Sequence, residues 1–235
     1  MGAPYNRIGL RECLEVAKNH DHYRSAVATG AGRGVAMGYW INAGLQSSAT
    51  LNVSSDGHVA VLTGSPDIGG SRASMALMAS EVLGIPFEHI HPQVAPTDSV
   101  GHTDVTGGSR TTLATGQAVI QAAEQCVAEL CRRAAVEWDV EAGLVAWAQG
   151  AAHYAEQTLT FEELAARAGS MGGPLTFSSS LTSSSTAPGF GVHICDAEVD
   201  KETGRTTITR YTAIQDAGKA IHPDYVEGQM QGGAA

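Results

Sequence analysis

The sequence has few basic residues and no cluster of them. Its 235 residues include 14 lysines and arginines against 24 aspartates and glutamates, which gives a formal net charge of -10 at pH 7. A protein that binds the phosphate backbone of nucleic acids needs lysine and arginine side chains gathered on one surface. We therefore expect no nucleic-acid partner.

The sequence also lacks a long hydrophobic run. A membrane-spanning helix needs roughly 20 consecutive apolar residues, and no stretch approaches that length. The first residues, MGAPYNRIGLREC, have neither the basic nor the apolar region of a secretion signal. From these two absences we expect a cytoplasmic protein that has no membrane partner.

Motifs that would identify a metal site or a common catalytic site are missing as well. The four cysteines show no CxxC spacing and the nine histidines show no HxxxH pair, so no metal ligands are predicted. The sequence contains no P-loop, no GxGxxG after a strand and no GxSxG elbow. Aspartates near glycine-rich loops are more typical of caps and turns than of general bases. We predict no catalytic residue from these patterns.

The elements that the sequence does predict alternate irregularly between strands and helices. Asp56-Gly57 between alternating apolar runs is a strong hairpin signal, and a second hairpin is predicted around a turn at 202–204. Apolar spacing predicts helices at 8–18, 71–84, about 118–134 and 161–168, with short strands near 35–45, 90–94 and 152–160. This order predicts an α+β fold in which helices pack on a mixed β-sheet.

The predicted domain organisation is a short lead-in followed by one large domain. Residues 1–33 hold one helix and a glycine-rich link, and residues 34–235 form the main domain. The tract TFSSSLTSSSTAPG is either a loop or a polar strand. The last residues, HPDYVEGQMQGGAA, read as the start of a helix without a cap, so we expect a fragment of a longer protein.

Three loops of small residues are candidates for binding an anion. Gly69-Gly70-Ser71-Arg72 and Gly107-Gly108-Ser109-Arg110-Thr111-Thr112 each precede a helix, and Gly228-Gln229-Met230-Gln231-Gly232 lies near the end. Free N–H groups at a helix start attract anions, and hydroxyl and guanidinium groups add donors for phosphate oxygens. Glycine followed by serine is also an ordinary helix start. The repeated Gly-Gly-Ser-Arg favours a phosphate-bearing cofactor.

Taken in their order along the chain, these motifs resemble those of a known family. The stretches LTGSPDIGGSRASMALMASEVLGIP, GGSRTTLATGQAV and AEVDKETGRTTITRYTAIQDAGKAIHPDYVEGQMQGG resemble the molybdopterin-binding region of the large subunit of the xanthine dehydrogenase and aldehyde oxidase family. The opening PYNRIGLRECLEVAK is similar to the segment that precedes this region in bacterial members. The resemblance covers essentially the whole chain. It implies an oxidoreductase family of molybdenum hydroxylases, which insert water-derived oxygen into aldehydes or N-heterocycles.

The resemblance also implies a cofactor and its contacts. The cofactor is molybdopterin with molybdenum, in bacteria usually as a cytosine dinucleotide. The implied contact residues are Gly69, Gly70, Ser71, Arg72, Ser109, Arg110, Thr111, Thr112 and Gln229. Many members have Gly-Gln-Gly in the first loop. Here Gly70 stands at the glutamine position, so that side-chain contact is absent.

The family's catalytic glutamate belongs to a Gly-Glu-Pro motif that does not occur in this sequence. For the full enzyme the resemblance implies iron–sulfur and flavin subunits or domains and a small-molecule substrate. For these 235 residues alone we expect no hydroxylase activity, and we expect self-association through uncovered apolar surface. Two alternatives stay open, a non-catalytic binding module for a phosphorylated pterin or nucleotide and a purely structural fragment.

Overall fold

The computed structural model describes residue 5 and residues 7–184 and 187–235. These form two compact units. The split unit contains the described residues up to Asn42 and those from 187 onward, and the central unit contains residues 43–184. The domain boundary predicted between residues 33 and 34 falls inside strand β1 (Ala31–Trp40). The lead-in helix and this strand therefore belong to the same unit.

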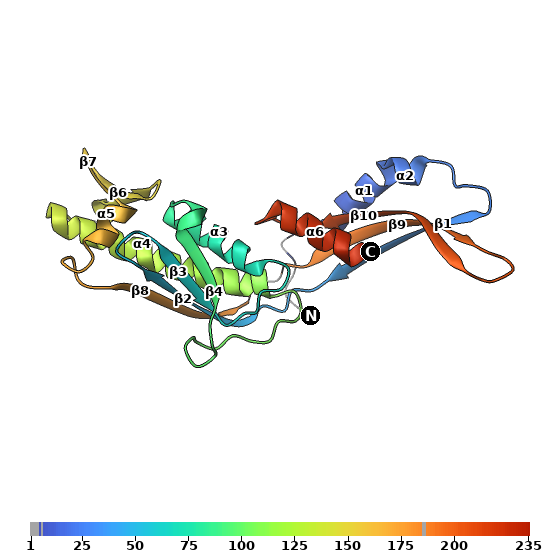
Figure 1. Cartoon of the computed structure of the whole chain (residues 1–235). Helices are drawn as coiled ribbons and strands as arrows, with labels where there is room; N and C mark the ends of the chain where they lie inside the picture. The colour runs from blue at the N-terminus through green and yellow to red at the C-terminus, as the bar shows by residue number, and fades with distance from the viewer. Residues whose placement is uncertain (1–4, 6, 185–186) are drawn as a thin grey trace. The chain divides into compact units, whose positions relative to one another are not determined.

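The split unit is a three-stranded antiparallel sheet with helices. Its strand order is β1-β9-β10, and the predicted second hairpin is confirmed as β9 (Gly189–Val199) and β10 (Thr206–Asp216). Helix α1 (Leu10–Asn19), predicted at 8–18, packs on the sheet and is followed by α2 (Asp21–Arg24) (Figure 1). Cys13 and Ala17 of α1 meet Val192 and Ile194 of β9 in a small core.

The split unit also contains the predicted helix near the end of the chain. This helix, α6 (Pro223–Ala234), begins with proline at its first turn, a position where the missing N–H costs no hydrogen bond. It has no buried residue and contacts β10. Its apolar side chains therefore contribute little to the core of this unit.

The central unit is built on a mixed four-stranded sheet of order β4-β3-β2-β8. The Asp56-Gly57 hairpin is confirmed as antiparallel β2 (Leu45–Val53) and β3 (Val59–Thr63). Strand β4 (Ile90–Val94) runs parallel to β3, because helix α3 (Ser71–Leu83) crosses between them. The mixed sheet with packed helices confirms the α+β prediction.

The serine- and threonine-rich tract forms a strand over most of its length. Strand β8 (Leu175–Ser183) pairs antiparallel with β2 and alternates between buried and more exposed residues. The polar-strand alternative is therefore correct for the tract up to Ser183. Residues 185 and 186 of the tract lie outside the described residues.

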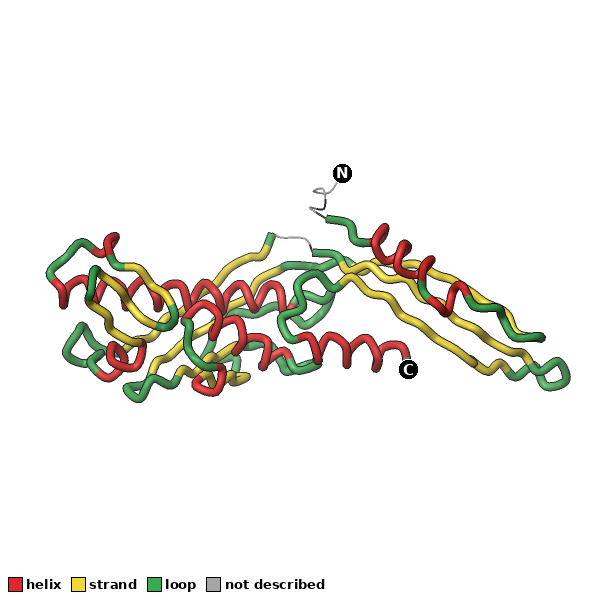
Figure 2. Tube along the Cα trace, turned by 90° about the horizontal axis from the view of Figure 1, so that it is seen from above, coloured by secondary structure: helices red, strands yellow, loops and turns green. Residues whose placement is uncertain are grey.

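Two helices cover one face of the central sheet. Helix α3 ends at Gly84 as predicted, with a left-handed φ of 72°, and the predicted long helix is α4 (Gly116–Trp138), preceded by one π-helical turn, η2 (Thr111–Thr115). Alternate sheet residues such as Leu51 and Val61 are buried against these helices. Figure 2 shows the long α4 helix lying along the strands of this unit.

A small outlying sheet completes the central unit. It consists of the hydrogen-bonded strands β5 (Ala146–Ala148), β6 (Ala151–Tyr154) and β7 (Gln157–Thr160), and the short helix α5 (Phe161–Ala166) follows. Thr160 and Glu163 form a capping box at the start of α5. Two short 3-10 turns, η1 (Phe87–His89) and η3 (Ala142–Leu144), connect elements. Within the described part of the chain, no helix has the length and apolarity needed to cross a membrane.

Candidate functional site

The two Gly-Gly-Ser-Arg loops of the central unit lie at one edge of its sheet. The first connects β3 to α3, and the second is the long connection from β4 to η2. Thr63 and Val94 are paired at the carboxyl ends of the two parallel strands, so both loops leave the sheet from the same edge. The Ser65 and Thr115 hydroxyls are 2.8 Å apart, and α3 contacts η2. The structure therefore brings the two predicted loops together where open α/β layers usually bind ligands.

The first loop enters its helix through two left-handed glycines. Gly69 has φ 65° and Gly70 has φ 77°, a conformation that favours glycine, and α3 begins at Ser71. The Asp67 carboxylate accepts hydrogen bonds from the backbone N–H of Arg72 at 3.0 Å and from its Nε at 2.8 Å. These two bonds hold the pKa of Asp67 below its ordinary value. An internal carboxylate thus occupies the first turn of the helix, where an external anion would also bind.

The second loop also contains two left-handed residues, but one position later in the motif. Gly108 has φ 65° and Ser109 has φ 54°, and the π-helical turn begins at Thr111. A left-handed serine is uncommon and is often found at functional sites. The Gly108 carbonyl accepts the N–H of Ala43 at 3.0 Å, which fixes the loop against the segment just before β2.

The Arg110 side chain is enclosed by the protein. It is fully buried and donates to the carbonyl oxygens of Gly44 (2.9 Å), Asp104 (3.0 Å) and Gln46 (2.5 Å) and to the Ser47 hydroxyl. Burial lowers the pKa of Arg110, against the smaller opposing effect of Asp104. The guanidinium that the sequence suggested for a cofactor is therefore used to hold the second loop to the start of β2.

Two threonine hydroxyls close to Arg110 in the sequence have no hydrogen-bond partner among the described residues. The Oγ1 atoms of Thr106 and Thr111 are buried and unpaired, whereas Thr112 is exposed. A buried hydroxyl without a partner costs about 1–3 kcal/mol, so native proteins usually provide one. A ligand oxygen that reached the Thr111 hydroxyl would satisfy it, which is consistent with the predicted binding site.

Gln229 lies in the other unit. It is an exposed residue of α6, whereas the two Gly-Gly-Ser-Arg loops belong to the central unit. The structure therefore brings eight of the nine predicted residues to one region, and the cofactor-binding role of all nine stays a prediction.

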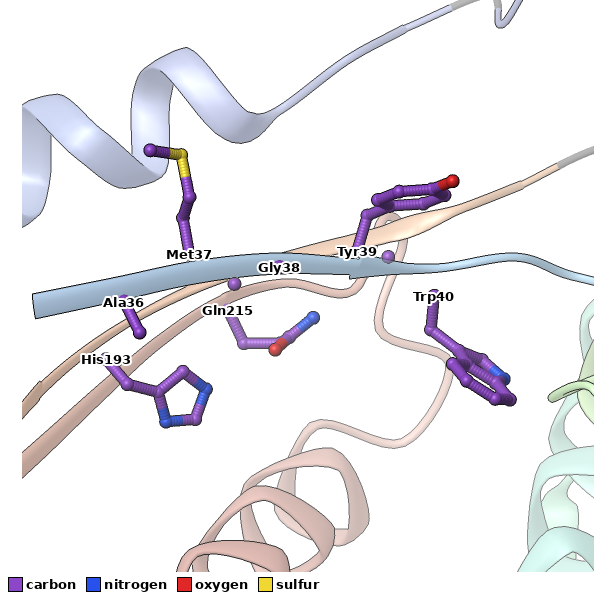
Figure 3. Close-up of a pocket in the computed structure, with 9 residues that line it drawn as sticks. Ala36, Met37, Gly38, Tyr39, Trp40, His193 and Gln215 are labelled. Carbon is purple, nitrogen blue, oxygen red and sulfur yellow. The ribbon is translucent and has the colours of Figure 1, made fainter.

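A groove in the split unit was not predicted from the sequence. It has a volume of about 300 Å³ and is lined by residues 36–40 of β1 together with Gly189, Gly191, His193 and Gln215. Figure 3 shows Trp40, His193 and Gln215 on one side of β1 and Met37 and Tyr39 on the other. The groove exists because Gly38 pairs with Gly191 and Trp40 with Gly189, which removes side chains from the sheet surface. The sequence feature that could have predicted this groove is the even spacing of glycines in the two strands, such as Gly189 and Gly191.

Comparison with known proteins identifies the family to which this chain is similar. The model of the molybdopterin cofactor-binding domain matches residues 10–235. The large chain of carbon monoxide dehydrogenase from Hydrogenophaga pseudoflava is 28% identical over 173 residues, which are 70% of this chain and 21% of that one. The aldehyde oxidoreductase molybdenum-binding subunit PaoC of Escherichia coli K12 is 27% identical over 243 residues, 97% of this chain and 32% of that one.

A solved structure shares the fold. Reconstituted CO dehydrogenase from Oligotropha carboxidovorans superposes with a TM-score of 0.87 at 23% identity, over 97% of this chain and 33% of that one. The chain thus spans a fifth to a third of the length of these relatives. Because the family model covers nearly all of the residues, the chain belongs to the molybdopterin cofactor-binding domain family of molybdenum-enzyme large subunits.

Proposed function

We propose that the chain supplies phosphate-binding loops for the molybdopterin cofactor of a bacterial molybdenum hydroxylase. The observation that carries this proposal is the meeting of two left-handed glycine loops at the carboxyl edge of β3 and β4, beside the unpaired Thr111 hydroxyl. Backbone N–H groups at such an edge suit phosphate oxygens. Membership of the family supports the choice of cofactor.

In this proposal, some residues at the carboxyl edge of β3 and β4 contact the ligand, and others hold the loops in place. We assign direct contacts to the backbone of Gly69, Gly70 and Ser71 and to the hydroxyl of Thr111. Arg72, whose side chain is half exposed, would turn from Asp67 to the ligand, while Arg110 supports the second loop from within. Ser109, Thr112 and Gln229 complete the proposed set. The bound cofactor would supply the redox chemistry of the molybdenum.

The activity of the whole enzyme belongs to this proposal as well. Relatives named as a carbon monoxide dehydrogenase and an aldehyde oxidoreductase suggest a small carbonyl-type substrate, and one named as a nicotine 6-hydroxylase suggests a heteroaromatic one. We further propose a cytosine dinucleotide form of the cofactor, iron–sulfur and flavin partner subunits, and a cytoplasmic location. Because the 235 residues contain no Gly-Glu-Pro motif, we expect binding without turnover when this chain is assayed alone.

Titration calorimetry with cytidine diphosphate and with inorganic pyrophosphate tests the binding role of the full 235-residue chain. We expect saturable binding that weakens by about tenfold in Arg72→Ala and in Thr111→Val, since each variant removes one donor to a charged ligand. The matched control is Arg132→Ala, which breaks a similar pair with Glu129 in the fifth turn of α4. Absence of saturable binding, or equal affinity in all four proteins, would favour the purely structural alternative.

A further inference from the structure

Three histidines gather at the edge of the central sheet that lies opposite the glycine loops. His58 immediately precedes β3, His91 is the second residue of β4, and His89 ends the η1 turn that leads into β4. These positions are at the amino ends of the two parallel strands. Five residues of strand, roughly 15 Å, separate them from the glycine loops at the carboxyl ends. The cluster is therefore independent of the proposed cofactor site.

The rings of His58 and His91 are arranged as a pair. Their planes differ by 14° with centroids 5.0 Å apart, and Nδ1 of His58 lies 2.9 Å from Nε2 of His91. At this distance one nitrogen carries the proton and the other accepts it. His91 is exposed and His58 is partly exposed, so an ion from solvent has access to the nitrogens.

We propose that His58 and His91 together bind a divalent transition-metal ion, with copper(II) or nickel(II) preferred. An ion that replaces the shared proton would be held by two imidazole nitrogens at about 2.0 Å each. Neighbouring positions of a square-planar or octahedral ion place two such nitrogens about 2.8 Å apart, whereas a tetrahedral ion needs about 3.3 Å. The observed 2.9 Å is close to the first separation. Because the two nitrogens point at each other in the hydrogen bond, each ring must turn so that both lone pairs meet at the ion, and the pair does not have to move apart.

The surroundings of the pair are suited to a cation. The His89 ring lies 4.9 Å from the His58 ring. Its Nδ1 is buried, has no hydrogen bond within the part of the chain that the structure describes, and lies 4.0 Å from a Glu162 carboxylate oxygen. The Asp56 carboxylate accepts the backbone N–H of His58 at 3.1 Å. Among the described residues no three potential ligands form a ready metal-binding set. The proposed site therefore uses two protein ligands, with water in the other coordination positions. A bound ion would link the start of β3 to the edge strand β4.

The test is titration of the full, untagged 235-residue chain with copper(II), nickel(II), zinc(II) and magnesium, followed by calorimetry. We expect one copper ion per chain, bound most tightly of the four, and no binding of magnesium, which prefers oxygen ligands. His58→Ala and His91→Ala should each weaken copper binding on the order of a hundredfold, because the second imidazole acts as an intramolecular ligand. His153→Ala, on the outlying sheet, is the matched control and should bind as the unmodified chain does.

Paramagnetic resonance of the copper complex provides a second readout that does not depend on stability. The spectrum should show coupling to two imidazole nitrogens in the unmodified chain and to one in either variant. Circular dichroism of each variant confirms folding, and exposed His91 gives the variant least expected to disturb it. Copper affinity unchanged in both variants, or a two-nitrogen spectrum that persists in His91→Ala, would overturn the proposal.

Discussion

The two Gly-Gly-Ser-Arg loops of the central unit share four residues in sequence and differ in structure. In the first, the left-handed pair is Gly69 and Gly70 and the helix begins at the serine. In the second, the left-handed pair is Gly108 and Ser109, and the helical turn begins after the arginine. Within the same motif, the left-handed pair of the second loop is thus shifted by one residue and the helix start by two.

This shift gives the two arginines opposite roles. Arg72, the second residue of α3, is half exposed and pairs with the Asp67 carboxylate at 2.8 Å. Arg110, the residue before the π-helical turn, points inward and donates to carbonyl oxygens of three residues. Arg72 is therefore the arginine that, under the proposed function, exchanges an internal anion for an external one, and Arg110 is a structural support.

The largest expected difference between the loops is in stability. Arg110→Ala should lower the free energy of unfolding by about 3–5 kcal/mol, because it leaves buried carbonyl oxygens without donors. Arg72→Ala removes a solvent-exposed ion pair and should lower it by about 1 kcal/mol or less. Urea denaturation of the full chain, followed by circular dichroism, measures both. Equal losses in the two variants would contradict the assigned roles.

Arg110→Lys sharpens the same test. Lysine keeps the charge but cannot direct donors from a planar fork to several acceptors, so we expect most of the loss to persist. Recovery of full stability in this variant would show that charge, and not the hydrogen-bond geometry, holds the loop.

The hairpin turn at Asp56-Gly57 and the end of α3 at Gly84 were predictable, but the burial of Arg110 was not. Asp56-Gly57 and Gly84 determine local backbone geometry, and the hairpin and helix end follow from neighbouring residues. Three of the four acceptors of Arg110 come from residues 44–47, more than 60 positions upstream, so no local pattern reveals them. The same reason explains the unpredicted split unit, in which β1 pairs with β9 about 150 residues later.

The next largest difference concerns the glycines of the second loop. A Cβ added to Gly108 would lie 2.7 Å from the Ala43 Cβ, and its φ of 65° is unfavourable for alanine. We expect Gly108→Ala to lower the free energy of unfolding by about 1–3 kcal/mol. Gly107→Ala, where an added Cβ meets nothing within 4 Å, is the control and should change it by less than about 0.5 kcal/mol. Thermal unfolding of both variants tests this difference, which disappears if Gly108 can shift away from Ala43.

A smaller effect is expected on anion affinity in the first loop. Asp67→Asn removes the internal charge that competes with a phosphate for Arg72 and the helix start. Pyrophosphate should then bind about fivefold more tightly, the factor for about 1 kcal/mol between unit charges 4 Å apart in water. The gain should shrink at 0.5 M salt, since salt screens exposed charges. Calorimetry that finds weaker binding in Asp67→Asn would mean that the carboxylate shapes the loop for the ligand instead of competing with it.

The smallest effect is the pH dependence of the first loop. The pKa of Asp67 is below its ordinary value of 3.8 in the folded chain, chiefly because the Arg72 N–H donates to it. Its contribution to stability is therefore fully present above the ordinary value and is lost as the pH falls through the lower folded value. The acceptors of Arg110 are carbonyl and hydroxyl oxygens, which do not titrate in this range, so acid should loosen the Arg72 contact first. Carboxyl carbon NMR of aspartate-labelled chain gives the Asp67 titration directly, and the stability lost between pH 5 and pH 3 should be smaller in Asp67→Asn. An equal loss in that variant would assign the acid sensitivity to other carboxylates and leave the two loops indistinguishable by pH.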